Sequence, residues 1–318
     1  MSTQEKIPSP MGGRSPASRK RLPALLSIIL ALALLAGITL SACAPRGETE
    51  EPVIDDQPVI IEEPEDPGPP PTPLPELAAI ARDYHERNED TVGWLYVPNA
   101  PSLDWFVLWY PHDTNNFYLR RNFEREYDFN GVYFADFRTQ WGDFTRENLS
   151  RNIVIYGHSM DDDPDSTLFS QFKRWWDEDW ARNNPHVFFS TLEEDMAWEI
   201  FSVHFSNIWV PYNTPDPDDE AFAALIEDAK ARSLWIYDDI EVTIEDTIIT
   251  FSTCIYGIPP EASPTGERIP LSYPNDYRFV VMARLVERDA FLEETVSITV
   301  NPDVASARLR ANATREEA

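Results

Sequence analysis

Hydrophobic and polar residues alternate in short runs between residues 77 and 286, which predicts many short strands and few helices. Apolar residues at helical spacing from Leu77 to Tyr84 predict a helix at the start of this region, and similar faces predict helices at 166–176 and 219–231. Strands are predicted at 92–97, 103–108, 131–136, 152–156, 187–190, 197–205, 247–254 and 278–286. The alternation at 294–300 fits one more strand or a segment outside the domain. Many strands with few helices between them favour an antiparallel or mixed barrel over a doubly wound sheet.

The first 43 residues predict an export signal or a membrane anchor. Four basic residues between positions 14 and 21 precede the uncharged, apolar run 22–40. This run is about the 20 residues needed to span a bilayer, so its length does not separate a cleaved signal from a retained anchor. The sequence Leu40-Ser41-Ala42-Cys43 is similar to a bacterial lipobox, whose cysteine is lipid-modified. We therefore expect attachment to the extracytoplasmic face of the cell membrane, through the apolar segment or a lipidated Cys43.

Residues 44–76 predict an extended linker. Positions 47–76 hold ten acidic residues, nine prolines and no lysine or arginine. Such a segment cannot bury enough apolar surface to fold, while its charge and its prolines extend it. We expect a folded domain at 77–290 and a C-terminal extension at 291–318.

The charge of the chain excludes one class of partner. A formal net charge of −29 at pH 7 would repel a polyphosphate, which argues against nucleic acid. The acidity does not indicate an acidic substrate, and it also suits an exported protein that must stay soluble. With 318 residues, of which 42% are hydrophobic, the chain is long enough for one sizeable packed domain.

Cys254 is the one thiol of the predicted folded domain, because the other cysteine, Cys43, lies in the export segment. An unpaired thiol is a liability in an oxidising compartment unless it is used. Cys254 ends the predicted strand 247–254, where it is either a small buried hydrophobe or a nucleophile at the rim of a sheet.

His158 and Arg278 supply the other groups that a cysteine acyl-transfer site needs. His158 follows strand 152–156 and a glycine, and Arg278 opens strand 278–286. An imidazole can take the thiol proton and return it to a leaving amine, while a guanidinium can stabilise the oxyanion. The order His158, Cys254, Arg278 differs from papain-like enzymes, in which the cysteine comes first.

Several other residues are less suited to these roles. Arg268 and Arg284 are alternatives to Arg278. The remaining histidines have no distinctive context; they are His85, His112, His186 and His204. Four aspartates at 161, 162, 163 and 165 follow His158, but the glycine and distal glutamate of an EF-hand loop are missing. We expect a solvated loop there, and neither a metal nor a cofactor.

Five segments carry a resemblance to a known family. They are DTVGWL at 90–95, NIVIYGHSM at 152–160, WEIFSV at 198–203, STC at 252–254 and RFVV at 278–281. Together, and in this order, they resemble the class B sortases across residues 77–286.

The resemblance implies a mainly β fold with accessory helices. The expected fold is a sortase-type eight-stranded β-barrel, with an N-terminal helix and a helix before the cysteine strand. It also implies that His158 is the acid and base, Cys254 the nucleophile, and Arg278 the oxyanion or substrate clamp. The partners would be exported proteins that bear a C-terminal sorting motif, cleaved after its threonine. The acyl group would pass to an amine of a peptidoglycan precursor or a pilin lysine.

The sequence departs from the family in two places. Ile255 follows the cysteine where the family often has an acidic residue, and the connection from Cys254 to Arg278 is longer than usual. Two other functions remain open, a cysteine peptidase that uses water as the acceptor and a non-catalytic surface lipoprotein. The presence of His158, Cys254 and Arg278 together argues against the second, because a binding module is free to lose any of them.

Overall fold

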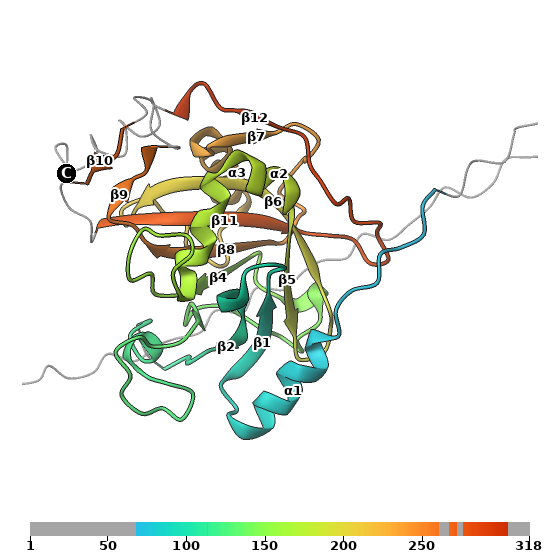
Figure 1. Ribbon diagram of the computed structural model, residues 1–318. Coiled ribbons are helices and arrows are strands. Elements are labelled where there is room, and N and C mark those ends of the chain that lie inside the picture. The colour runs from blue at the N-terminus through green and yellow to red at the C-terminus, as the bar shows by residue number, and fades with distance from the viewer. Residues whose placement is uncertain (1–67, 113, 261–266, 272–275, 305–318) are drawn as a thin grey trace, which may run out of the picture. The chain divides into compact units, whose positions relative to one another are not determined.

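Eight strands form a closed barrel in the computed structural model, which describes residues 68–112, 114–260, 267–271 and 276–304 (Figure 1). The order around the barrel is β1-β2-β3-β4-β8-β11-β6-β5. The strands are β1 (Thr91–Tyr96), β2 (Asp104–Leu108), β3 (Phe134–Ala135), β4 (Asn152–Tyr156), β5 (His186–Thr191), β6 (Ala197–Asn207), β8 (Ile248–Cys254) and β11 (Tyr277–Leu285). Most neighbours are antiparallel, but β2 with β3 and β4 with β8 run parallel. The predicted mainly β, eight-stranded barrel is confirmed.

The barrel core is built from runs of apolar residues that are buried on both faces. Every residue of β8 except Cys254 is buried, and β4 is buried from Asn152 to Ile155. Strands covered on both faces read as continuous apolar runs rather than as alternating ones. Phe172 stacks on Phe251 with ring centroids 4.6 Å apart, which fastens the segment after β4 to the cysteine strand.

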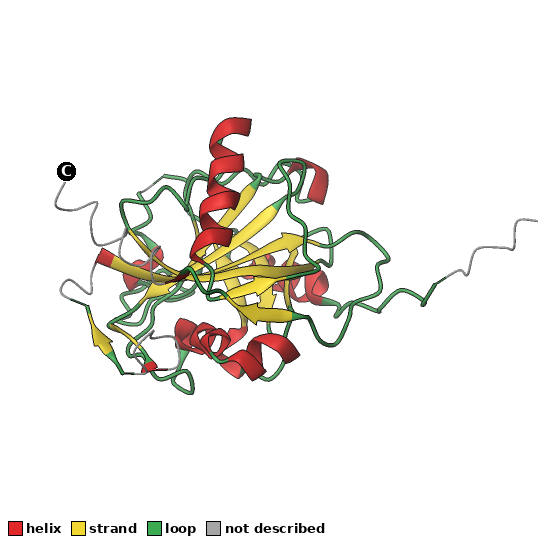
Figure 2. Ribbon diagram, turned by 90° about the horizontal axis from the view of Figure 1, so that it is seen from above, coloured by secondary structure: helices red, strands yellow, loops and turns green. Residues whose placement is uncertain are grey.

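The helices lie around the barrel, as Figure 2 shows. The first is α1 (Leu77–Arg87), as the spacing of its apolar residues predicts, and α3 (Asp219–Arg232) precedes the cysteine strand. The carboxylate of Asp218 caps α3 by accepting a hydrogen bond of 2.9 Å from the Ala221 amide. The short helix α2 (Glu178–Asn183) lacks an apolar stripe long enough to predict it.

Two elements differ from their predicted form. The segment expected to be a helix at 166–176 is the 3-10 helix η4 (Leu168–Trp176), of which seven residues are buried. Its geometry follows from packing on all sides rather than from one apolar stripe. The strand expected at 131–136 is only β3, because Gly131 has a φ of +58° and a Cβ there would lie 2.5 Å from the Leu119 carbonyl oxygen.

Short strands complete the domain. The C-terminal segment contributes β12 (Ile298–Val300), which pairs with β7 (Trp235–Tyr237). A further hairpin pairs β9 (Gly257–Ile258) with β10 (Ile269–Pro270), between the cysteine strand and β11. In the described part of the chain, 3-10 turns between the other elements include η1 (Pro101–Leu103), η2 (Tyr118–Arg120) and η3 (Arg146–Asn148).

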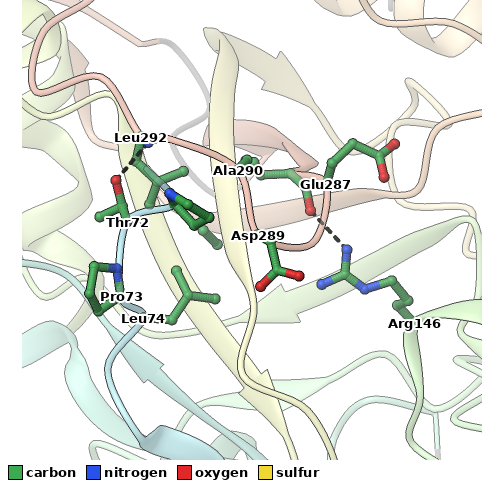
Figure 3. A pocket seen from close by; sticks show the side chains of 11 residues that line it. Thr72, Pro73, Leu74, Arg146, Glu287, Asp289, Ala290 and Leu292 are labelled. Atoms are coloured by element: carbon green, nitrogen blue, oxygen red, sulfur yellow. Dashed lines mark hydrogen bonds between the residues drawn. The ribbon is translucent and has the colours of Figure 1, made fainter. Parts of the chain in front are cut away.

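The end of the linker packs against the C-terminal part of the domain (Figure 3). The Thr72 amide donates to the Ala290 carbonyl over 3.0 Å, and the Leu292 amide donates to the Thr72 hydroxyl over 2.9 Å. A cavity of about 380 Å³ lies between these segments, and neither a cysteine nor a histidine lines it. These contacts join the start of the folded domain to the segment that follows β11.

Residues 22–40 and Cys43, predicted as the membrane attachment, lie outside the described residues. Among the helices of the described part, from residue 68 to residue 304 with its gaps, none has the length and apolar character to cross a bilayer.

Candidate active site

Cys254 and Arg278 face each other across two neighbouring strands. Cys254 is the last residue of β8, Arg278 is the second residue of β11, and the two are register partners in this antiparallel pair. The end of one antiparallel strand lies beside the start of the next, so both residues are at the same end of the barrel. Each is half-buried, and Cys254 is a free thiol.

His158 reaches the same end of the barrel because β4 runs parallel to β8. Tyr156 is the register partner of Ser252. His158 and Cys254 each come two residues later in these parallel segments, so they lie level with each other. The Thr253 hydroxyl donates to the Gly157 carbonyl over 2.7 Å and holds the two strand ends together. Gly157 is required here, since a Cβ would lie 2.5 Å from the buried Phe169 ring.

One cavity brings the three residues together. It has a volume of about 200 Å³ and is lined by His158, Cys254 and Arg278. Its other walls carry aromatic, amide and aliphatic groups, which come from Asn115, Leu119, Phe134, Tyr156, Ile208, Tyr212 and Asn213 among others. A thiol, an imidazole and a guanidinium around one small cavity form a set that can perform acyl transfer.

The environment of His158 favours its neutral form. Burial lowers the pKa of His158 below its ordinary value of 6.5, and the charge of Arg120 lowers this pKa further. The hydrogen bond of Nε2 to the Leu119 carbonyl, at 2.9 Å, opposes the shift. Because a carbonyl only accepts, Nε2 carries the proton, and Nδ1 is left with the lone pair of a base.

The two alternative arginines occupy other places. Arg284 is level with Ile248 at the opposite end of β8, about 20 Å along the strand from Arg278. It pairs there with Glu199 over 2.8 Å. Arg268 is 53% exposed and pairs with Asp162 over 2.7 Å. Of the three arginines, Arg278 is the one that lines the cavity with Cys254.

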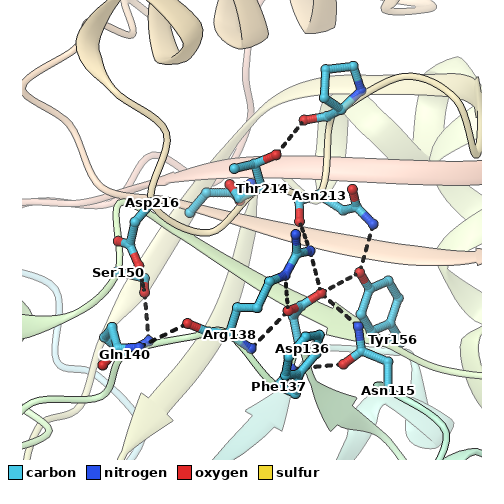
Figure 4. A network of polar contacts seen from close by, with 12 residues as sticks. Asn115, Asp136, Phe137, Arg138, Gln140, Ser150, Tyr156, Asn213, Thr214 and Asp216 are labelled. Atoms are coloured by element: carbon cyan, nitrogen blue, oxygen red, sulfur yellow. Dashed lines mark hydrogen bonds and ion pairs between the residues drawn. The ribbon is translucent and has the colours of Figure 1, made fainter. Parts of the chain in front are cut away.

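A buried carboxylate that the sequence does not reveal orders one wall of the cavity (Figure 4). Asp136 accepts hydrogen bonds from Asn115 over 2.8 Å and from Tyr156 over 2.9 Å, and it pairs with Arg138 over 2.8 Å. Burial raises the pKa of Asp136, but the hydrogen bonds from Arg138 and Asn115 and the charge of Arg138 outweigh burial and leave this pKa below its ordinary value. The ionised carboxylate therefore holds the Asn115 and Tyr156 side chains in fixed orientations. No local pattern distinguishes Asp136 from the many other aspartates of the chain.

Lys173 is a second residue that the sequence interpretation missed. It lies on η4 between Phe172 and Arg174, and its side chain is fully buried. The sequence does hold a signal of this burial, because a lysine four residues from Phe169 and three from Trp176 falls on an otherwise apolar helical face.

The part of the chain that the structure describes has no group of three or more His, Cys, Asp or Glu side chains that could hold a metal ion.

Known proteins similar to this chain include two curated relatives. No family model matches the chain. Sortase B of Listeria monocytogenes serovar 1/2a (strain ATCC BAA-679 / EGD-e) is 29% identical over 174 residues, which are 54% of this chain and 66% of that protein. Sortase B of Staphylococcus aureus (strain NCTC 8325 / PS 47) is 29% identical over 168 residues, 52% of this chain and 64% of that protein. The chain thus spans slightly less than two thirds of each relative.

Solved structures agree with the curated relatives. A Staphylococcus aureus sortase B–substrate complex superimposes with a TM-score of 0.53 and 25% identity. The superposition covers 67% of this chain and 87% of that one. The similarity therefore extends to the three-dimensional arrangement of the barrel.

Proposed function

Because this chain belongs to the class B sortases, we propose that it is a cysteine transpeptidase acting on exported proteins. The observation that carries the proposal is the register of Cys254 with Arg278, with His158 level with both around one cavity. Three groups that are far apart in sequence meet at one end of a rigid barrel, as the proposed reaction requires.

The first half of the proposed reaction forms a thioester. Nδ1 of His158 takes the thiol proton of Cys254, and the thiolate attacks the carbonyl carbon of the scissile peptide bond. The carbonyl electron pair moves to oxygen, and the guanidinium of Arg278 stabilises this oxyanion. When the pair returns, the C–N bond breaks. The protonated His158 gives its proton to the leaving amine, and the acyl group stays on Cys254.

The second half transfers the acyl group to an amine. His158 takes a proton from the acceptor amine, whose nitrogen attacks the thioester carbonyl. The C–S bond then breaks, and the Cys254 thiolate regains its proton from His158. In this proposal the donor is an exported protein with a C-terminal sorting motif, and the acceptor is an amine such as that of a peptidoglycan precursor. A solved structure of a Staphylococcus aureus sortase B–substrate complex, to which this chain is similar, supports the proposal that the chain binds a substrate of this kind.

Labelling of Cys254 tests the proposal directly. A protein that starts after Cys43, incubated with a library of threonine-containing peptides, should gain the mass of the acyl fragment on Cys254. Triglycine should discharge the adduct as a ligated product, and Cys254→Ala should form neither species. If the acyl fragment leaves Cys254 only as the free carboxylic acid, even with triglycine present, the protein is a peptidase that uses water as the acceptor. No adduct with any peptide would contradict the acyl-enzyme itself.

The proposed substrates also require an extracytoplasmic domain. The basic flank, the apolar run 22–40 and Leu40-Ser41-Ala42-Cys43 support an N-terminal attachment to the membrane. The acidic, proline-rich linker would then hold the domain away from the membrane surface.

A further inference from the structure

Lys173 stands out because its charge is buried without a role in the chemistry just described. Its side chain is 0% exposed, and its ammonium nitrogen lies 2.6 Å from the Ser159 hydroxyl, 2.5 Å from the Asp161 carbonyl and 2.9 Å from the Asp162 carboxylate. Three oxygen atoms around one nitrogen match the three donors of an ammonium group. Burial lowers the pKa of Lys173, and the hydrogen bond to Asp162 opposes that shift.

Asp162 connects this ammonium to the segment that follows the cysteine strand. One carboxylate oxygen accepts from Lys173 and also from the Tyr256 amide, over 3.0 Å. The other accepts from Arg268 over 2.7 Å. The Tyr256 hydroxyl donates a hydrogen bond of 2.9 Å to the Ser159 carbonyl.

These contacts join the two catalytic residues through their chain neighbours. Ser159 follows His158 directly, and Tyr256 follows Cys254 by two residues. As far as His158 and Cys254, strands β4 and β8 are held together by their pairing and by the hydrogen bond from Thr253 to Gly157. Past these two residues, the contacts of Lys173 and Asp162 hold together the segments that follow His158 and Cys254.

We propose that Lys173 is a positioning residue whose buried ammonium, paired with Asp162, holds the segment after His158 against the segment after Cys254 and so sets the geometry of the imidazole and the thiol. The effect on turnover rests on the proposed function, whereas the effect on the two segments does not. A buried pair of this kind is weak evidence for stability, because an apolar replacement is often as stable. Its contribution is expected in the orientation of the groups, where a displacement of about 1 Å can cost about 100-fold in rate.

The test compares Lys173→Met with Arg174→Met. Arg174 is the next residue on η4 and also pairs with the loop after His158, but its partner Asp165 is 79% exposed. Methionine fills the volume of lysine without its charge. In Lys173→Met, we expect faster amide exchange at Ser159, Asp163 and Tyr256, and a kcat lowered about 10- to 100-fold with KM within about threefold. Arg174→Met should match the wild type in both measurements.

A double variant separates positioning from stability. Asp162→Asn with Lys173→Met removes both charges, so it should regain thermal stability while kcat stays low. A normal kcat in Lys173→Met, or unchanged exchange at these amides, would overturn the inference. Amide exchange that rises over the whole barrel in both Lys173→Met and the double variant would also overturn the inference, because it would indicate a purely structural role for Lys173. If the wild type cleaves no peptide, the proposed function fails, and the exchange data still decide whether Lys173 holds the two segments.

Discussion

At the scale of single residues, the site depends on which charges and lone pairs face the cavity. One ring nitrogen of His158 is committed to the Leu119 carbonyl, so the proposed proton exchange with Cys254 falls to the other ring nitrogen. Arg278 lines the cavity, while Arg284 and Arg268 are paired with Glu199 and Asp162.

The first prediction concerns the identity of the arginine. Arg278→Lys keeps the charge but loses the planar fork of the guanidinium. We therefore expect kcat for peptide cleavage to fall about 10²- to 10³-fold, which is the loss found when one hydrogen-bond donor to an oxyanion is removed. Arg284→Lys serves as the control and should remain within about threefold, because it lies at the other end of β11. The reverse pattern, with Arg284→Lys inactive and Arg278→Lys near normal, would show that the assignment is wrong.

The second prediction concerns pH. The proposed base acts only when neutral, so kcat/KM should fall as pH drops through the pKa of His158. Burial lowers this pKa, which puts the acidic limb of the pH profile below 6.5. His158→Ala should lose about 10²- to 10⁴-fold in rate, and that acidic limb should disappear. An acidic limb above pH 6.5, or one that persists in His158→Ala, would contradict this role.

At the scale of elements, the site is made by strand ends held in register. The parallel pairing of β4 with β8 and the antiparallel pairing of β8 with β11 put three consecutive strands side by side. Each carries one of the three residues at or just beyond its end. Small changes at these ends should therefore disturb the chemistry more than changes at the opposite end.

Gly157 provides the third prediction. In Gly157→Ala the new Cβ would lie 2.5 Å from the Phe169 ring, which is fully buried and cannot swing aside. We expect a loss of about 1–3 kcal/mol in the free energy of unfolding, measured with urea, because overpacking displaces the backbone. Peptide cleavage should also fall, since His158 follows directly.

Gly257→Ala is the matched control for that change. Its Cβ would meet the guanidinium of Arg268, the far end of a half-exposed, flexible side chain. The control should therefore stay within about 0.5 kcal/mol of the wild type. Equal losses in the two variants would show that the Phe169 contact is not the cause.

At the scale of the whole molecule, the proposal combines a catalytic barrel with an attachment that precedes it. The described domain begins with the end of the linker, where Thr72 bonds to the segment after β11. The cavity around Cys254 is built from residues between Asn115 and Arg278. The proposed chemistry is thus independent of how the N-terminus meets the membrane.

The attachment provides the fourth prediction. If Cys43 is acylated, purified protein should have the intact mass of a diacylated chain that begins at Cys43. Cys43→Ser should then accumulate the unprocessed chain in the membrane. A wild-type chain that keeps residues 1–42 would instead establish a transmembrane anchor, with peptide cleavage unaffected.

Local patterns in the sequence predicted the barrel class, and the resemblance carried by a few short segments predicted the three residues around the cavity. Alternating and continuous apolar runs reflect the burial of each strand, which depends on residues close in sequence. The segments around His158, Cys254 and Arg278 are also local, so a resemblance could be recognised in them. The helix predicted at 166–176 was wrong in type, because contacts from all sides decide the geometry of η4.

Only the tertiary structure decided how distant residues meet. Arg268 and Arg284 were alternatives to Arg278 in the sequence, and the strand register puts Arg278 beside the thiol. Lys173 bonds to Asp162, 11 residues away, and Asp162 in turn bonds to Tyr256, 94 residues away. Asp136 bonds to Tyr156, 20 residues away. Register and long-range burial arise when the barrel closes, because closure chooses the neighbours of each strand. A period of two or of 3.6 residues describes which face of an element is apolar, but not what that face will touch.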